Sequence, residues 1–267
     1  MKIDDESKLI NIALSMRNNI LNLSFAGRDN GAHIAPALSI VEIMAVIYLY
    51  AMNHNSDKFI LSKGHGALAY YAALFEAGII SREQLFTYEK NGGDFPGQPS
   101  KSIDLGIDYS SGSLGLGLSY GCGLALGNIM SGNKNKIYVV MGDGELNEGT
   151  VWEGAFFASH NKLTNLIAVI DRNSMQSDGN TEDILKLDIE SLWNSCGWNA
   201  VVCNGHDFNA LKQAFDSLSD EKPTVIIADT TKGKGVSFME NNKEWHHNRL
   251  SEKQLNDALA ELEANIC

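Results

Sequence analysis

Hydrophobic positions follow two different periods along this chain, and the alternation between them predicts the order of its elements. Residues 7–25 carry apolar side chains at helical spacing, and Gly27 can end that helix. Ser39 and Glu42 have the S-x-x-E spacing of a capping box, so a second helix is expected to begin there. The predicted helices are 7–25, 39–52, 67–77, a short one from Ser81, 115–131, 150–161, 188–196, 208–218 and one from Ser251; the predicted strands are 59–61, 137–141, 166–170, 200–202 and 225–228.

The alternation of helices and continuously apolar strands predicts the fold class. Strands that are apolar along their whole length are buried on both faces, which is typical of a parallel sheet covered by helices. We therefore predict an α/β fold with a doubly wound, mainly parallel sheet, formed by residues 1–267 as a single domain. In such sheets, ligands bind beyond the carboxyl ends of the strands.

Composition and charge exclude several classes of function. The net charge of −12 argues against a nucleic-acid partner, because an acidic surface repels phosphate backbones. No run of about 18 apolar residues indicates a transmembrane helix, and the acidic amino terminus lacks the features of a secretory signal. The four cysteines, Cys122, Cys196, Cys203 and Cys267, have no metal-ligand or C-x-x-C spacing, so we expect reduced thiols in a cytoplasmic protein.

The most informative chemistry follows two of the predicted strands. Asp143 follows strand 137–141, and Asn173 follows strand 166–170. If these strands are neighbours, a carboxylate and an amide oxygen meet at one edge of the sheet, and Mg²⁺ prefers such oxygen ligands and shares its shell with substrate phosphates. The alternative interpretation is that both are ordinary turn residues.

Two further patterns are weaker. The glycine-rich segment from Ser111 to Gly117 leads into a helix, whose first N–H groups could bind a phosphate, although these glycines could also serve close packing. His33, His65 and His246 lie in short loops, and the loops of His33 and His65 contain glycines that could let ligand oxygens approach closely. His54, His160 and His206 are interpreted as surface or core residues.

Together these segments resemble the thiamine-diphosphate-binding half of transketolase. The spacing of G142-D-G and Asn173, with 28 residues between Gly144 and Asn173, is similar to the thiamine diphosphate motif of that family. The other matching segments, in family order, are L61-S-K-G-H-G-A-L68, S111-G-S-L-G-L-G117, G142-D-G-E-L-N-E-G149, G205-H-D207 and K232-G-K-G-V-S-F-M-E-N241 with W245-H246. The chain is most similar to the amino-terminal subunit of split transketolases.

The resemblance implies roles for the matching positions. Mg²⁺ would be bound by Asp143, Asn173 and the backbone carbonyl of Met175. The expected cofactor-binding residues are His65, Gly112, Ser113, Leu114, Gly142, Asp143, Gly144, Glu145, Asn173, Met175 and His246; the expected catalytic residues are His33, His65, His246 and Glu148, the last at a dimer interface. The histidines would contact ketose hydroxyls and move protons.

The resemblance also implies an activity and a partner. The expected activity is transfer of a two-carbon ketol unit from a ketose donor to an aldehyde or keto-sugar acceptor, with thiamine diphosphate and Mg²⁺ as cofactors. The glutamate that activates the aminopyrimidine lies in a second, pyrimidine-binding domain in this family. We expect that domain on a separate carboxy-terminal subunit, in a heterotetramer of two plus two chains.

Several positions depart from the family pattern. Gln98 stands where a histidine is usual, and glutamine cannot move a proton. Ser177 replaces an apolar residue, His247 replaces a glycine, and Ala32 and Ala35 stand where glycines are common. These departures predict a sugar substrate other than the usual pentose phosphates, for example a nucleotide-linked sugar.

Two alternatives remain open on the sequence. The first is another thiamine diphosphate enzyme, such as an α subunit of a 2-oxoacid dehydrogenase or a relative of deoxyxylulose-phosphate synthase. The histidines favour polyol substrates instead. The second is a non-catalytic half that binds cofactor only, in which Gln98 and Ser177 mark a decayed site.

Overall fold

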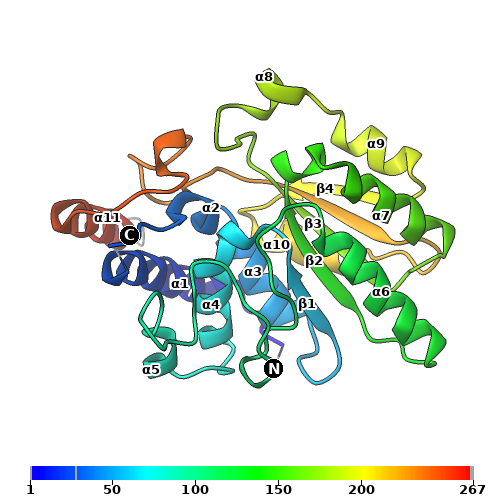
Figure 1. The fold of residues 1–267 in the computed structure, drawn as a ribbon, viewed down its shortest axis with the longest axis horizontal. Helices are drawn as coiled ribbons and strands as arrows, with labels where there is room; N and C mark the ends of the chain where they lie inside the picture. The colour runs from blue at the N-terminus through cyan, green and yellow to red at the C-terminus, as the bar shows by residue number, and fades with distance from the viewer. Residues whose placement is uncertain (1, 28, 265–267) are drawn as a thin grey trace.

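The computed structural model describes residues 2–27 and 29–264, and its centre is a five-stranded sheet. Every neighbouring pair in the order β1-β2-β3-β5-β4 is parallel. Helices cover both faces of this sheet (Figure 1). The predicted doubly wound parallel sheet is therefore confirmed. The strands are β1 (Lys58–Leu61), β2 (Ile137–Gly142), β3 (Leu166–Arg172), β4 (Asn199–Asn204) and β5 (Thr224–Asp229).

The predicted helices are all present, with boundaries shifted by a few residues. The α-helices are α1 (Glu6–Ala26), α2 (Ile34–Leu38), α3 (Val41–Val46), α4 (Ala67–Glu76), α5 (Arg82–Leu85), α6 (Gly117–Met130), α7 (Gly149–His160), α8 (Thr181–Leu185), α9 (Ile189–Ser195), α10 (Phe208–Asp216) and α11 (Glu252–Ala264). A π-helical turn, Ile47–Ala51, continues α3, and short 3-10 turns cover Gly64–Gly66, Ile103–Leu105, Gly144–Asn147 and Lys243–Trp245. The sequence did not predict α2 or α8, because five residues are too few to show a helical period.

The core consists of two layers, one on each face of the sheet. Alternate residues of a strand point to opposite faces, so Tyr138 and Val140 of β2 pack with α1, α3, α4 and α10, whereas Val139 and Met141 pack with α6, α7 and α9. Both layers are fully buried along β2 and β3. This burial explains why the strands read as unbroken apolar runs.

The predicted capping box at Ser39 and Glu42 is wrong. Ser39 ends α2, and its hydroxyl donates to the carbonyl of Pro36 and to the carboxylate of Asp171. The Glu42 carboxylate accepts from Arg17 and from the ring of His206, so it does not reach back to Ser39. Tertiary partners therefore outcompete the local capping pattern at both positions.

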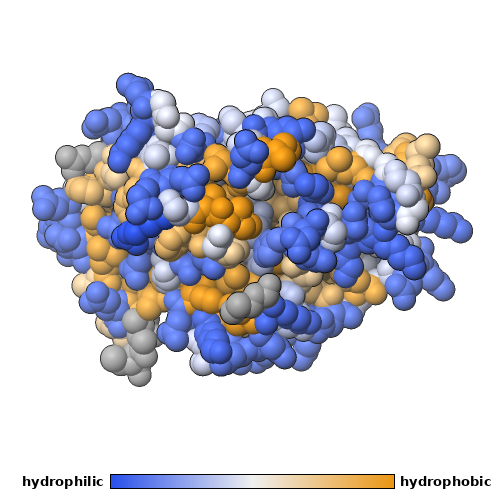
Figure 2. All heavy atoms as spheres, turned by 90° about the horizontal axis from the view of Figure 1, so that it is seen from below, coloured by the Kyte–Doolittle hydropathy of each residue, from blue (hydrophilic) through white to orange (hydrophobic). Residues whose placement is uncertain are grey.

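The surface and the cysteines add little that is unusual. Figure 2 shows apolar side chains in patches between larger hydrophilic areas on one face of the molecule. Cys122, Cys196 and Cys203 are free thiols, as expected, whereas Cys267 lies outside the described residues. Among the residues that the structure describes, no helix combines the length and the hydrophobicity needed to cross a bilayer.

Candidate active site

Asp143 and Asn173 lie together at the carboxyl edge of the sheet. β2 and β3 are adjacent, with Gly142 paired to Asp171, so the residues that follow each strand come from neighbouring loops. Both side chains are buried and line the same cavity of about 220 Å³. The strand-end position predicted for these two residues is therefore confirmed.

Most of the expected site residues surround this cavity. Those that line it are His65, Leu114, Gly142, Asp143, Gly144, Glu145, Glu148, Asn173, Met175 and His246. Gly112, Ser113 and His33 do not line it, although the ring of His33 lies 5.4 Å from that of His246.

The Asp143 carboxylate is held by backbone amides at the start of two loops. It accepts from the N–H of Gly144 at 2.8 Å and from that of Ser174 at 2.6 Å. Burial, with the neighbouring Asp171 carboxylate, raises the pKa of Asp143 to about 6. A divalent cation would favour the charged form of this carboxylate, because opposite charge lowers such a pKa.

The Asn173 amide has one partner on each side. Its Nδ2 donates to the Asp171 carboxylate at 2.7 Å, and its Oδ1 accepts from the N–H of Met175 at 3.1 Å. The oxygen therefore faces the loop that also carries the Met175 carbonyl. Together with Asp143, these atoms form a set of hard oxygen donors suited to Mg²⁺.

Two buried charged residues were missed as functional residues by the sequence analysis. Asp171 lies within β3 and is completely buried, where it pairs with Lys63 at a distance of 2.5 Å between Nζ and Oδ2. Burial alone would raise the pKa of Asp171, but Lys63 and the hydroxyls of Thr230 and Ser39 hold that pKa below its usual value. A charged residue inside an apolar strand was the signal that could have revealed this pair, because such charges are almost never buried without a partner.

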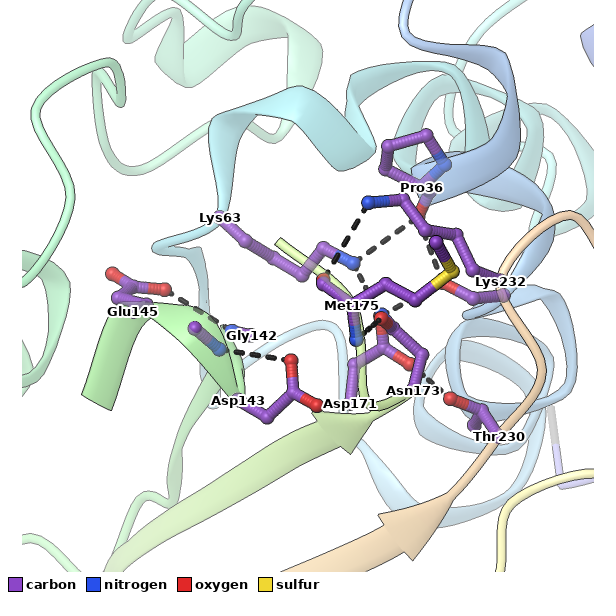
Figure 3. Close-up of polar contacts among 12 residues, drawn as sticks. Pro36, Lys63, Gly142, Asp143, Glu145, Asp171, Asn173, Met175, Thr230 and Lys232 are labelled. Carbon is purple, nitrogen blue, oxygen red and sulfur yellow. Dashed lines mark hydrogen bonds and ion pairs between the residues drawn. The ribbon is translucent and has the colours of Figure 1, made fainter. Parts of the chain in front are cut away.

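Lys232 is a second buried cation, and it faces the cavity. Its Nζ lies 3.3 Å from the carbonyl of Gln176, 3.5 Å from that of Met175 and 3.0 Å from Nδ1 of His246 (Figure 3 labels Lys232 and Met175). None of these three partners is a carboxylate. Burial and the nearby Lys63 lower the pKa of Lys232 to about 8. An anion bound in the cavity would stabilise this ammonium.

The three expected histidines form one cluster. The ring centroids of His33, His65 and His246 lie 5.4 to 6.0 Å apart. Burial is the main cause that lowers the pKa of His33 to about 4, the pKa of His246 to about 3 and the pKa of His65 well below 6.5. The imidazoles are therefore neutral near pH 7, and each can donate one hydrogen bond and accept another.

Two backbone amides at the start of α6 are bound within the protein. The N–H of Gly115 donates to the Glu145 carboxylate at 2.8 Å, and the N–H of Gly117 donates to Ser62 at 3.1 Å. Ser62 in turn donates to Glu145. These two amides are already bound within the protein and are not free for a phosphate, whereas the expected cofactor contacts of Gly112, Ser113 and Leu114 stay a prediction. Glu145 acts here as a carboxylate that ties the glycine-rich segment to the end of β2.

The positions that depart from the family pattern lie around the cavity. Ser177 lines it. The side-chain oxygen of Gln98 lies close to two glycines. A Cβ on Gly64 would lie 3.0 Å from this oxygen, and a Cβ on Gly112 would lie 3.2 Å from it. His247 packs against His33 with ring centroids 4.6 Å apart. These side chains therefore shape the surroundings of His33 and His65.

A larger groove of about 770 Å³ lies elsewhere, beside α1, α10 and α11. Its buried charges satisfy one another: Arg17 pairs with Glu42 at 2.7 Å, and Nδ1 of His206 lies 3.0 Å from the same carboxylate. The N–H of Thr231 donates to the other ring nitrogen of His206, which supports the structural interpretation of that histidine.

The residues around the smaller cavity fit a Mg²⁺–diphosphate group. Asp143 and the oxygens near Asn173 would provide the cation ligands, and Lys232 would provide a positive charge for the anion. Nε2 of Gln176 is buried without a hydrogen-bond partner among the described residues, so it is a free donor at the cavity wall. No group of three or more His, Cys, Asp or Glu residues suited to a metal occurs in residues 2–27 and 29–264. Mg²⁺ commonly shares its shell with phosphate oxygens of the ligand and with water.

Comparison with known proteins agrees with this chemistry. Residues 15–265 match the family described as "Transketolase, thiamine diphosphate binding domain". The chain is 40% identical over 260 residues to one of the subunits of the apulose-4-phosphate transketolase of Actinobacillus succinogenes, and the match covers 94% of each chain. It is 38% identical over 254 residues to the 6-deoxy-6-sulfo-D-fructose transketolase subunit SqwG of a Clostridium species, covering 91% of this chain and 92% of that one.

Solved transketolases share the fold but are much longer chains. The structure superimposes on transketolase from Leishmania mexicana with a TM-score of 0.86 at 23% identity, covering 96% of this chain and 41% of that one. For the Campylobacter jejuni enzyme the TM-score is 0.85 at 24% identity, and the coverage is 98% and 43%. The chain thus spans about two-fifths of the solved transketolases.

Proposed function

Because this chain belongs to the transketolase thiamine diphosphate-binding domain family, we propose that it is the cofactor-binding subunit of a split, transketolase-type enzyme. The enzyme transfers a two-carbon ketol unit from a ketose to an aldehyde or keto-sugar acceptor. The single observation that carries this proposal is the meeting of Asp143 and Asn173 in one cavity at the edge between β2 and β3.

The cofactor is held by a small set of residues. Asp143, Asn173 and the carbonyl of Met175 bind Mg²⁺, and the ammonium of Lys232 pairs with the diphosphate. Leu114 and Gly144 lie at the cavity wall, and Gly144 must lack a side chain, because a Cβ there would lie 2.6 Å from Gln176. When bound, thiamine diphosphate supplies the electron sink for carbon–carbon cleavage.

The histidine cluster handles the hydroxyls and protons of the sugar. His33, His65 and His246 are neutral near pH 7, so the rings of His33 and His65 can accept a proton from a hydroxyl or donate one to it. The Nδ1 of His246 already lies 3.0 Å from Lys232, so His246 meets a hydroxyl as a donor through Nε2. Their close packing brings three such groups to one side of the cavity. Glu148 directly precedes α7 and also lines the cavity. We assign it to the boundary with the partner.

A separate subunit completes the site. Three relatives of matching length are named as transketolase subunits. The cavity of about 220 Å³ is also below the roughly 300–1,000 Å³ of a complete ligand pocket. The partner carries the pyrimidine-binding domain, so residues 1–267 form one domain of a heterotetramer with two copies of each subunit. The free thiols of Cys122, Cys196 and Cys203 support a cytoplasmic location.

The face formed by α6 and α7 is the docking surface for this partner. Its large apolar side chains are exposed: Met130 by 80%, Phe156 by 59% and Phe157 by 44%. Continuity with the site supports this choice, because Leu114 and Glu148, which precede α6 and α7, both line the cavity. An exposed patch of this kind marks an interaction site in soluble proteins.

The substrate is a sugar outside the usual pentose phosphates. Two relatives are named for apulose-4-phosphate and for 6-deoxy-6-sulfo-D-fructose. Ser177 lines the cavity. Gln98 lies next to Gly64, which precedes His65, and His247 lies next to His33. These three positions change the size and the hydrogen-bonding groups that meet the sugar.

The proposal is tested by co-expressing this chain with the product of the adjacent open reading frame. Calorimetry measures binding of thiamine diphosphate with and without Mg²⁺, and ketose or hydroxypyruvate consumption is compared with CO₂ release from 2-oxo acids. We expect metal-dependent binding and ketol transfer. Binding that needs no metal, or CO₂ release without ketol transfer, would contradict the proposal, and pentose-phosphate turnover at ordinary transketolase efficiency would contradict the atypical substrate.

A further inference from the structure

Asp171 collects hydrogen bonds from four separate segments at the edge of the sheet. Its Oδ2 accepts from Ser39 at 2.7 Å, from Lys63 at 2.5 Å and from Nδ2 of Asn173 at 2.7 Å, and its Oδ1 accepts from Thr230. The carboxylate is completely buried and does not line the cofactor cavity. Asp171 therefore acts only through the groups that it holds (Figure 3).

The chemistry of these bonds determines which way the Asn173 amide points. A carboxylate paired with a buried ammonium is ionised, and an ionised carboxylate only accepts hydrogen bonds. Only the NH₂ end of the amide can therefore face Asp171, which leaves Oδ1 of Asn173 on the side of Met175 and the cavity. With a neutral group that both donates and accepts at position 171, either end of the amide could face it.

We propose that Asp171 is a positioning residue that holds the oxygen of Asn173 toward the bound cation, with Lys63 keeping the Asp171 carboxylate in place. This inference rests on the proposed function of the cavity as a Mg²⁺–diphosphate site. Lys63 is fixed independently, since its Nζ also donates to the carbonyl of Pro36 at 3.1 Å. Partners of this kind behind a metal ligand commonly change metal affinity by about 10- to 100-fold when they are removed.

The test compares D171N with a double variant that exchanges the two side chains. In D171N/N173D the carboxylate at position 173 has two equivalent oxygens, so it binds a cation whichever way it turns. Mn²⁺ affinity by electron paramagnetic resonance and Mg²⁺-dependent thiamine diphosphate binding by calorimetry are measured on the complex with the partner subunit. We expect D171N to lose about 10- to 100-fold in cation affinity and the double variant to recover most of that loss.

A matched control separates positioning from general stability. Glu42 is also a buried carboxylate, paired with Arg17, and it lies outside the cofactor cavity. E42Q should lower the melting temperature but leave Mn²⁺ affinity unchanged. The inference is overturned if D171N binds the cation as tightly as the wild type, or if the double variant binds no more tightly than D171N. Absence of metal-dependent binding in the wild type would instead refute the proposed function.

A measurement on the wild type keeps the test valid if D171N fails to fold. With ¹⁵N-labelled asparagine, the Nδ2 protons of Asn173 should exchange slowly with solvent, because one of them is bound to a buried carboxylate. Protection should be present with and without the cation. Fast exchange without the cation would show that Asp171 does not hold the amide, and would overturn the inference.

Discussion

The ammonium of Lys232 lies 3.0 Å from Nδ1 of His246. Because an ammonium has only donors, Nδ1 must accept, and the proton of the neutral imidazole is on Nε2. The same lysine, 2% exposed, has backbone carbonyls and this imidazole as its hydrogen-bond partners and faces the cavity. One buried cation therefore sets the tautomer of a catalytic candidate and provides charge for an anion.

Removing the charge of Lys232 should weaken cofactor binding. Hydrogen bonds to charged groups contribute about 1.5–3 kcal/mol, so Lys232→Met should raise the dissociation constant of thiamine diphosphate by roughly 10- to 150-fold. Lys234→Met is the matched control, since that lysine is part-exposed and pairs with Glu240. Calorimetry at constant Mg²⁺ measures both. Equal affinities for the two variants would argue against a diphosphate contact by Lys232.

Replacing Asp143 should affect the melting temperature of the chain and its Mg²⁺-dependent cofactor binding in different ways. Burial and Asp171 raise the pKa of Asp143 to about 6, so its charged form is disfavoured in the folded chain. Asp143→Asn removes this buried charge but also one of the two acceptors for the N–H groups of Gly144 and Ser174, so the melting temperature of the ligand-free chain should change little. The same variant should abolish Mg²⁺-dependent cofactor binding. Thermal unfolding and calorimetry provide the two measurements. A variant that still binds the cofactor in a metal-dependent way would exclude Asp143 as a ligand.

The free energy of unfolding should decrease at acid pH, because the partly buried His33 must then be protonated. Burial, followed by His247, lowers the pKa of His33 to about 4 from an ordinary value of 6.5. Between these two pKa values the unfolded chain binds more protons than the folded one. The contribution of His33 to the free energy of unfolding is therefore fully present above pH 6.5 and is lost as the pH falls toward 4. His33→Asn should reduce this loss, as measured by melting temperature against pH. The same pH dependence in wild type and variant would contradict the assignment to His33.

The exposed phenylalanines of α7 should be needed for this chain to bind the second subunit. Phe156→Asp places a charge on the face that we assign to the partner, and it should abolish co-purification with the second subunit while leaving the fold unchanged. Ile10→Asp is the matched control, because Ile10 on α1 is exposed to a similar extent, 53% against 59%. Size-exclusion chromatography of the co-expressed chains gives the result. If Ile10→Asp disrupts the complex and Phe156→Asp does not, the docking surface is on the other side of the sheet.

Two glycines of α6 should respond in opposite ways to alanine. A Cβ on Gly117 would lie 2.4 Å from Ser62, whereas a Cβ on Gly123 would meet no atom within 4 Å. Gly123→Ala should stabilise the chain by about 0.5–1 kcal/mol through helix propensity. Gly117→Ala should destabilise it by about 1–3 kcal/mol through overpacking. Urea unfolding of the chain measures both changes, and a stable Gly117→Ala variant would show that Ser62 can move aside.

The parts of this molecule that could be predicted from sequence are those determined by local pattern. β2 and β3 are buried, so their sequences are continuously apolar and predict strands. Asp143 and Asn173 follow these two strands and therefore lie at one edge of the sheet. The sheet order, in which β5 lies between β3 and β4, could not be read from any single segment. It depends on contacts between residues far apart in the chain.

Local patterns mislead at positions where a residue distant in sequence binds the group that the pattern assigns to a neighbour or a ligand. Glu42 could have capped a helix, but Arg17 and His206 bind it instead. The amide of Gly115 could have bound a phosphate, but Glu145 accepts its hydrogen bond. Lys63 lies within a segment that resembles the family, yet its role depends on Asp171, which is 108 residues away in sequence. Such pairings are set by the tertiary fold and leave no periodic signal.

The carboxylate of Glu145 has a consequence for how this scaffold could be adapted to new sugars. It holds Gly115 and Gly142 at once, so the backbone on both sides of it forms one rigid wall. A bulkier sugar cannot be accommodated by displacing that wall without breaking buried bonds. Adaptation is therefore confined to side chains, and Gln98, Ser177 and His247 are the positions where directed evolution should concentrate its mutations.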